Sequence, residues 1–258
     1  MAGNFAFNFL SMSQISRFSF AKSTAFVLVF LVAASLSRAQ LRDSVAIKTS
    51  GRLSNNVHTQ LRPREFAIPA GLVAYGVLAL KSEELTEFDN SVKEEVWTDL
   101  KHKPFHIDNY AQYAPGISVF ALRAAGIGGQ HDLRSEVALY FLSNAIMAMI
   151  VNPVKYATHV RRPDGFGRNA FPSGHTATAF AGAEFLHQEY GRQSSWYSIA
   201  GYSVATGVGF MRVYNNRHWV RDVVAGAGIG MLSTKLAYLV WPKVDHLLFH
   251  HQSPAPVF

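Results

Sequence analysis

The sequence contains no cysteine among its 258 residues. This absence excludes a disulfide-bonded scaffold, a thiolate zinc site and a cysteine nucleophile. Charged residues are also scarce, at 16% of the chain, whereas about a quarter is usual in a soluble protein. Any chemistry must therefore come from other side chains, and the low charge fits either a membrane protein or a very large core.

Hydrophobic residues make up 49% of the chain, which excludes an intrinsically disordered protein. The length fits one large domain or two small ones. The 24 Lys and Arg residues against 17 Asp and Glu give a formal net charge of +7. Outside the N-terminus the excess gathers in residues 155–222, which hold 8 basic and 4 acidic residues. A partner that carries phosphate is the simplest explanation of such a stretch.

Residues 1–39 have the features of a secretory signal peptide. Arg17 and Lys22 precede the uncharged stretch 23–37, and small residues, Ser37 and Ala39, stand at the positions expected before a cleavage site. We expect cleavage after Ala39, and an uncleaved membrane anchor is the alternative. In either case the rest of the chain is expected to be exported.

Residues 40–105 are expected to form a region of their own. Residues 40–65 are polar and indicate a linker, and residues 66–80 form an uncharged apolar helix. Within 82–103, Leu85, Phe88 and Val92 recur at three- and four-residue steps among charged residues, which predicts an amphipathic helix. We expect its apolar face to pack on the core, and a helix lying flat on a membrane is the alternative.

Beyond residue 105 the chain alternates between apolar helical stretches and polar loops. Helices are predicted at 109–125, 135–154, 174–190, 195–212 and 222–240. No stretch shows the Val/Ile/Thr alternation of a sheet, so the predicted fold class is all-α. Residues 246–258 are assigned to a C-terminal tail.

Hydropathy leaves a membrane bundle and a soluble bundle open. The stretches 137–154 and 194–211 are uncharged and approach the ~20 apolar residues that a spanning helix needs. Arg123 and Lys235, in contrast, interrupt the first and last predicted helices.

The first of three polar clusters runs from Lys155 to Pro163. Lys155 and Arg162 are seven residues apart, so two turns of helix would bring both cations to one face. Together they can bind a phosphoryl group, the arginine through its two-pronged guanidinium group and the lysine as a point charge. Taken alone, two cations at a helix end more often cap the helix dipole and face water.

The second cluster is Pro172-Ser173-Gly174-His175, directly before the helix predicted at 174–190. Ser173 can lie at the first turn, where free backbone N–H groups attract an anion, and Gly174 allows close approach of a ligand. An ordinary serine N-cap followed by a surface histidine is the alternative.

The third cluster contains Arg212, His218 and Asp222. His218 and Asp222 are four residues apart, so on a helix the carboxylate can accept a hydrogen bond from one imidazole nitrogen and leave the other free as a nucleophile or base. A plain surface ion pair has the same spacing.

In this order, the three clusters resemble the signature of the type 2 phosphatidic acid phosphatase superfamily, which includes bacterial acid phosphatases and vanadium haloperoxidases. The family pattern is Lys, six residues, Arg-Pro; then Pro-Ser-Gly-His; then Ser-Arg, five residues, His, three residues, Asp. Only the serine before Arg212 differs, because Met211 stands there. The resemblance covers residues 106–242, and it implies a helical bundle with membrane-embedded helices and a catalytic domain over 106–245.

The resemblance also implies a role for each matched residue. His218 would attack phosphorus to form a phosphohistidine, oriented by Asp222, while His175 protonates the leaving oxygen as general acid. The phosphate oxygens would be held by the remaining matched residues, which are Lys155, Arg162, Ser173, Gly174 and Arg212. No metal or other cofactor is expected, because this cationic cradle does what Mg²⁺ does elsewhere.

The expected substrate is a phosphorylated lipid or polyprenyl carrier, such as a phosphatidate-like lipid, undecaprenyl diphosphate or a lipid A phosphate. The resemblance implies a bacterial inner-membrane enzyme whose active site faces the periplasm. Neither a nucleic acid nor an obligate protein partner is expected. Two alternatives stay open, a soluble periplasmic acid phosphatase and a vanadium-dependent haloperoxidase.

Overall fold

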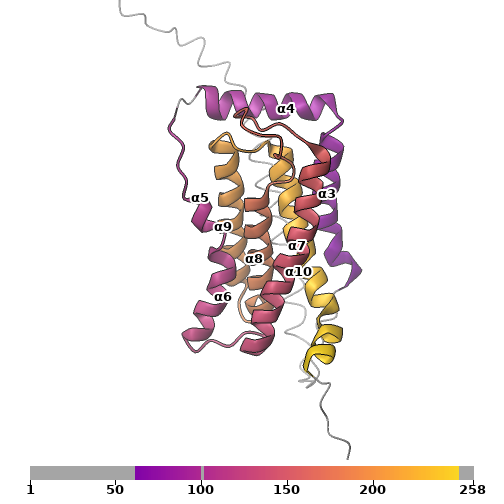
Figure 1. The fold of residues 1–258 in the computed structure, drawn as a ribbon. Helices are drawn as coiled ribbons and strands as arrows, with labels where there is room; N and C mark the ends of the chain where they lie inside the picture. The colour runs from indigo at the N-terminus through magenta and orange to yellow at the C-terminus, as the bar shows by residue number, and fades with distance from the viewer. Residues whose placement is uncertain (1–61, 100–101, 250–258) are drawn as a thin grey trace, which may run out of the picture.

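The computed structural model describes residues 62–99 and 102–249, and every regular element within them is helical (Figure 1). The all-α prediction is therefore confirmed for this part of the chain. The predicted signal peptide, most of the 40–65 linker and the end of the predicted tail lie outside the described residues. The helices are α3 (Ala67–Ala79), α4 (Glu83–Lys93), α5 (Asp108–Ala111), α6 (Ala114–Ala124), α7 (Leu133–Thr158), α8 (Gly174–Tyr190), α9 (Ser195–Tyr214) and α10 (Val220–Phe249).

Several of these helices begin at a side chain that caps the first turn. Ser82 Oγ accepts a hydrogen bond from the Leu85 N–H at 3.3 Å, which starts α4. Asp132 Oδ1 accepts one from the Ser135 N–H at 3.1 Å, which starts α7. Such caps satisfy N–H groups that have no partner inside the helix. The helix boundaries thus follow from local sequence as well as from packing.

Helix α8 forms the centre of the bundle, with 13 of its 17 residues buried. It packs against α6, α7, α9 and α10. Glycines permit the close approach of its neighbours: a Cβ atom at Gly226 of α10 would lie 2.5 Å from the Ser173 carbonyl oxygen, and one at Gly182 would lie 2.7 Å from the Gly116 nitrogen. These small residues therefore allow neighbouring helices to approach closely.

Two described helices, Leu133–Thr158 and Val220–Leu247, are long and apolar enough to cross a membrane. The first is the more exposed to the surroundings, and Phe141 and Met149 on it are 68% and 76% exposed. Lys235 does not interrupt the second, because it is fully buried and its Nζ lies 2.8 Å from Glu184 Oε1. Helix α9, which contains the uncharged stretch 194–211, does not meet the same test.

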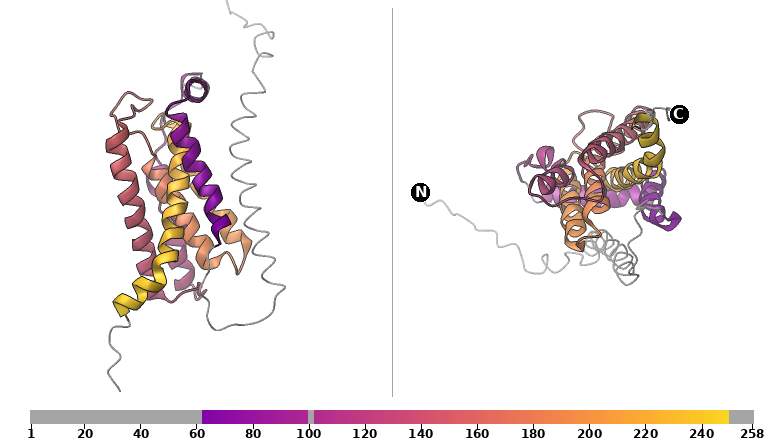
Figure 2. Two further views of the ribbon diagram at one scale, coloured as in Figure 1. Left: turned by 90° about the vertical axis from the view of Figure 1, so that its right-hand side faces the viewer. Right: turned by 90° about the horizontal axis from the view of Figure 1, so that it is seen from below.

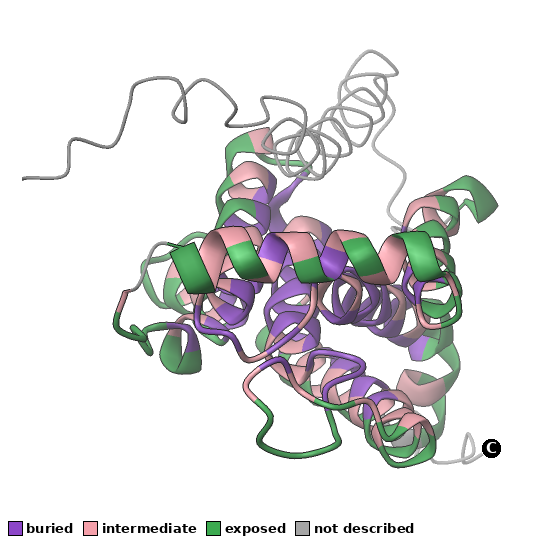
Figure 3. Ribbon diagram, turned by 90° about the horizontal axis from the view of Figure 1, so that it is seen from above, coloured by how far each residue is buried: buried purple, intermediate pink, exposed green. Residues whose placement is uncertain are grey.

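Helix α4 lies across one end of the bundle. The chain bends by 94° between Pro63–Ala79 and Glu83–Asp99, so α4 runs roughly perpendicular to the other helices (Figure 2). Val92 and Phe88 contact Val213 and Val220 below them, which confirms the expected core-facing side, and the opposite side is exposed (Figure 3). The helix predicted over 82–103 is present as α4 and continues as a π-helical stretch, Glu94–Asp99, whereas residues 102–103 are not helical.

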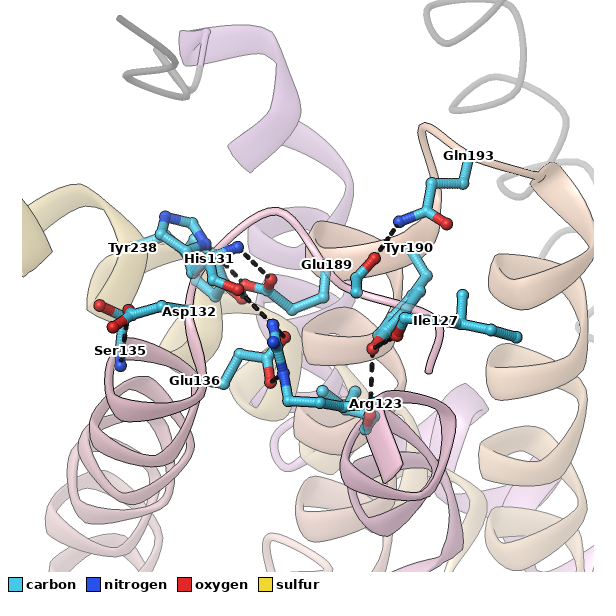
Figure 4. Close-up of polar contacts among 12 residues, drawn as sticks. Arg123, Ile127, His131, Asp132, Ser135, Glu136, Glu189, Tyr190, Gln193 and Tyr238 are labelled. Atoms are coloured by element: carbon cyan, nitrogen blue, oxygen red, sulfur yellow. Dashed lines mark hydrogen bonds and ion pairs between the residues drawn. The ribbon is translucent and has the colours of Figure 1, made fainter. Parts of the chain in front are cut away.

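A buried polar network occupies the opposite end of the bundle (Figure 4). Arg123 of α6 donates to Glu136 of α7, with Nη2 2.6 Å from Oε1. His131 Nδ1 lies 2.8 Å from Glu189 Oε1 of α8, and the Tyr238 hydroxyl donates to the same oxygen. These ionisable groups are paired with one another, as burial requires.

Candidate active site

The three polar clusters meet at the end of the bundle that α4 covers. Lys155 lies in the last turn of α7, Ser173 caps the start of α8 and Arg212 lies in the last turn of α9. His218 lies in the turn before α10, and Asp222 in the first turn of α10. The fold therefore brings together residues that are up to 67 positions apart in the sequence.

Lys155 reaches across the start of α8. Its Nζ donates hydrogen bonds to the carbonyl oxygens of Asn169 at 2.8 Å and Pro172 at 2.6 Å. Its Cε lies 3.9 Å from where a Cβ atom on Gly174 would be. The ammonium group is thus fixed beside the backbone of the Pro-Ser-Gly-His segment.

Arg162 is placed differently from the prediction. Helix α7 ends at Thr158, where His159 adopts a left-handed conformation with φ of 50°, so no continuous helix carries Lys155 and Arg162 on one face. A loop returns Arg162 to the site instead, with its Nε donating to Asn169 Oδ1 at 2.9 Å. The charges of both cations still act on the same group, the imidazole of His218.

Ser173 is the N-cap of α8 and is fully buried. Its Oγ accepts a hydrogen bond from the Thr176 hydroxyl at 2.9 Å, and its backbone N–H donates to the Asp222 carbonyl oxygen at 2.9 Å. This bond ties the start of α8 to the start of α10. The first turn of α8, which attracts anions, is thereby held next to Asp222.

Arg212 is buried and fixed by an acidic partner that the sequence analysis missed. Its Nη1 donates to Asp108 Oδ2 at 2.5 Å, while its Nε has no hydrogen-bond partner. Asn215 Nδ2 donates to the other carboxylate oxygen of Asp108 at 3.1 Å. One edge of the guanidinium group is therefore anchored, and a buried N–H group remains unused.

His218 and Asp222 come together, although the expected helical arrangement is wrong because α10 begins only at Val220. His218 Nδ1 lies 3.4 Å from Asp222 Oδ2, and the same oxygen accepts a hydrogen bond from the Trp219 N–H at 2.9 Å. A tight turn replaces the helical turn. The imidazole presents its other nitrogen, Nε2, away from the carboxylate.

The environment of His218 keeps its imidazole neutral. Burial is the largest effect that lowers the pKa of His218 well below its usual range, and the charges of Arg212, Lys155 and Arg162 lower it further. A neutral imidazole has the free lone pair that a nucleophile needs. The three cations predicted to bind phosphate therefore all act on the predicted nucleophile.

His175 follows Gly174 in the first turn of α8. Its Nε2 lies 3.0 Å from Asn109 Oδ1 of the short helix α5. Burial, followed by the charge of Arg212, lowers the pKa of His175 to about 4. Neither Asn109 nor Asp108 stood out in the sequence, because a four-residue helix has no periodicity and neither residue belongs to the three clusters.

Unpaired buried polar atoms mark this end of the molecule. Within the described residues, Arg212 Nε, His218 Nδ1 and Asp222 Oδ1 are among six buried side-chain atoms without a hydrogen-bond partner. None of the six belongs to the network of Figure 4. Of these three atoms, Arg212 Nε is an N–H donor that a bound anion can use, whereas an ionised Asp222 Oδ1 can only accept a hydrogen bond.

The described residues contain no group of three or more His, Asp or Glu side chains that could hold a metal ion. The site as built offers positively charged and N–H donors together with two histidines. These groups are complementary to a phosphate ester.

The model of the PAP2 superfamily matches residues 136–245, the stretch that supplies every predicted site residue. Residues 136–245 are thus similar to the PAP2 superfamily. This confirms the resemblance to type 2 phosphatidic acid phosphatases. Helices α3 to α6, with Asp108 and Asn109, lie outside the matched PAP2 stretch.

Two curated relatives are named as phosphatases. A lipid A 1-phosphatase of Porphyromonas gingivalis is 40% identical over 153 residues, which is 59% of this chain and 34% of the relative. A probable diacylglycerol pyrophosphate phosphatase 1 of Schizosaccharomyces pombe is 33% identical over 101 residues, covering 35% of this chain and 34% of the relative. The chain thus matches about a third of the length of each.

Among solved structures, the chain is similar to a transmembrane PAP2-type phosphatidylglycerolphosphate phosphatase from Bacillus subtilis. The likeness covers 85% of this chain and 98% of that one, with 18% identity and a TM-score of 0.37.

Proposed function

We propose that this protein is a phosphatase that hydrolyses a phosphorylated lipid or polyprenyl carrier through a phosphohistidine intermediate at His218. The observation that carries the proposal is the convergence of Lys155, Arg162 and Arg212 on one buried, neutral histidine. The match of residues 136–245 to the model of the PAP2 superfamily supports it.

In the first step, His218 Nε2 attacks phosphorus while the bond between phosphorus and the leaving oxygen breaks. His175 donates a proton to that oxygen, and Asp222 stabilises the imidazole that becomes positively charged. Lys155, Arg162 and Arg212 bind the non-bridging oxygens, with Ser173 and the Gly174 N–H completing the cradle.

In the second step, water attacks the phosphohistidine, gives its proton to His175 and releases inorganic phosphate. The positive charge of the cradle stabilises the charge that builds up on the phosphoryl oxygens, so no metal ion is needed. The catalytic domain is therefore placed at 106–245, which includes α5 and its contacts to Arg212 and His175.

A lipid substrate is supported by the helices suited to a membrane and by the lipid-phosphatase names of the curated relatives. The decisive experiment measures phosphate release by the purified full chain in detergent from lipid A, undecaprenyl diphosphate, phosphatidate and an aryl phosphate. Release from at least one lipid, unchanged by EDTA, is expected. Activity on the aryl phosphate alone would favour the soluble-type acid phosphatase, and halide oxidation with vanadate but no phosphate release would favour a haloperoxidase.

The site is placed on the periplasmic side of a bacterial inner membrane, because the N-terminal sequence predicts export. The absence of cysteine allows a direct test, since an introduced cysteine is the only thiol. Phe166→Cys lies in the exposed loop at the site, and Gly128→Cys lies in an exposed loop at the opposite end. A membrane-impermeant maleimide should label only Phe166→Cys in intact cells, and labelling of only Gly128→Cys would reverse the orientation.

A further inference from the structure

The short helix α5 is fixed at the active site although it precedes the PAP2-matched residues. Asp108 is fully buried and bonds both Arg212 and Asn215. Asn215 in turn bonds the backbone of Phe105, with Oδ1 accepting from the N–H and Nδ2 donating to the carbonyl oxygen, each at 2.9 Å. These contacts hold the chain before α5 against the end of α9. The next residue along, Asn109, is therefore held in a defined place.

The side chain of Asn109 contacts His175, the predicted general acid. Its Oδ1 faces His175 Nε2 at 3.0 Å. An amide oxygen can only accept a hydrogen bond, so the facing nitrogen of His175 carries a proton. The other ring nitrogen, Nδ1, is then the one that can give and take a proton during turnover.

We propose that Asn109 is a positioning residue that holds His175 with its proton on Nε2, so that Nδ1 exchanges the catalytic proton with the leaving oxygen. The inference rests on the proposed phosphatase function. In the first step the cationic imidazole gives the Nδ1 proton to the leaving oxygen as the phosphorus–oxygen bond breaks, and it remains neutral with Nε2–H bonded to Asn109. In the second step Nδ1 takes a proton from the attacking water.

An amide suits this position better than a carboxylate. The titratable groups that act on His175 are Arg212, Asp108, His218 and Arg162, and all but Asp108 disfavour its charged imidazole. A neutral acceptor orients the ring without adding a negative charge that would hold the proton too tightly. An aspartate at position 109 would keep the hydrogen bond but raise the pKa of His175.

The test compares Asn109→Ala and Asn109→Asp with the same changes at Asn90, an exposed asparagine on α4. Substrates are an alkyl phosphate, with a poor leaving group, and a nitrophenyl phosphate, with a good one. Because a positioned general acid contributes about 10²–10⁴-fold, Asn109→Ala should lower kcat/KM on the alkyl ester by roughly 10- to 100-fold. On the nitrophenyl ester its kcat/KM, which does not depend on hydrolysis of the phosphohistidine, should fall by less than about 3-fold, because that leaving group scarcely needs a general acid.

Asn109→Asp should retain most of the activity and shift the alkaline limb of the kcat profile upward by about one pH unit or more, while both Asn90 variants match the wild type. Equal losses on the two esters with Asn109→Ala would overturn the proposal. So would an Asn109→Asp pH profile that coincides with that of Asn90→Asp.

A measurement without turnover separates this inference from the proposed function. In the ¹⁵N NMR spectrum of histidine-labelled protein, neutral His175 should show the Nε2–H form in the wild type and a mixture of both tautomers in Asn109→Ala. The expected spectra together with no phosphatase activity on either ester would refute the proposed function and leave the contact standing. An active wild type whose His175 tautomer is unchanged in Asn109→Ala would refute the positioning role alone.

Discussion

His218 Nδ1 lies 3.4 Å from Asp222 Oδ2, across the turn that leads into α10. Both side chains are buried, and the second carboxylate oxygen, Oδ1, has no hydrogen-bond partner. The turn thus holds a carboxylate beside Nδ1, and the proposed mechanism uses the other ring nitrogen, Nε2, for attack on phosphorus. Asp222 can stabilise positive charge on His218 only while this geometry persists.

Replacing Asp222 by asparagine tests this relationship. The change keeps the shape of the side chain but removes the negative charge, so the phosphohistidine imidazole loses its stabilisation. We expect kcat to fall by about 10²–10⁴-fold, by analogy with the loss of an orienting carboxylate in hydrolase triads, and His218→Ala to abolish turnover. The measurement is phosphate release by protein with an unchanged melting temperature. An Asp222→Asn variant with wild-type kcat would show that the carboxylate has no role.

The pH dependence should report on His175. Burial and the charge of Arg212 lower the pKa of His175 to about 4 in the free protein, so its protonated form is depleted as the pH rises above that value. After correction for substrate ionisation, kcat/KM should therefore fall with rising pH from about 4. The bound phosphate group is an anion and favours the imidazolium form of His175. The value of kcat, which reports on the enzyme–substrate complex, should therefore fall at a higher pH than kcat/KM does. His175→Ala should lose this fall, and a variant that keeps it would contradict the assignment.

The buried pair Lys235–Glu184 should contribute to stability and not to catalysis. Removing one member leaves an uncompensated charge, so Lys235→Met should lower the free energy of unfolding by about 3–5 kcal/mol. The double variant Glu184→Gln/Lys235→Met should recover part of that loss. Eleven helical residues, or about 16 Å, separate Glu184 from Ser173, so folded protein should keep its kcat. Unfolding in detergent and phosphate release measure the two effects, and a loss of kcat in folded Lys235→Met would contradict this separation.

The close packing of α10 on α8 depends on Gly230. A Cβ atom there would collide with the Ala177 carbonyl oxygen, so Gly230→Ala should destabilise the protein by about 1–3 kcal/mol. Gly207 on α9 is the matched control, because no atom lies within 4 Å of its Cβ position. There the same change should stabilise the helix by about 0.5–1 kcal/mol. Equal melting temperatures for both variants would refute the packing argument.

Local patterns in the sequence predicted much of the fold. The helix at 174–190 matches α8 residue for residue, because Ser173 caps its start and Gly191 follows its last residue. Predictions failed where the chain leaves a helix within a motif. The spacing from Lys155 to Arg162 indicated two helical turns, but α7 ends at Thr158 and a loop completes the distance.

Contacts between distant segments could not be predicted from the sequence. Asp108 bonds Arg212 across 104 positions, and Asn109 bonds His175 across 66. Neither contact leaves a local signature. Lys235 likewise suggested an interrupted apolar helix, because its partner Glu184 lies 51 positions away. Whether a charged residue interrupts an apolar helix or is buried beside a partner can be decided only when that partner is known.

The stereochemical course at phosphorus distinguishes a phosphohistidine intermediate from direct attack by water. The substrate is an aryl phosphorothioate made chiral with oxygen isotopes, hydrolysed by the full chain in isotopically labelled water. Attack by His218 and then by water makes two in-line displacements, each of which inverts the configuration, so we expect net retention. Net inversion would mean that water attacks the substrate directly, and it would contradict the phosphohistidine mechanism.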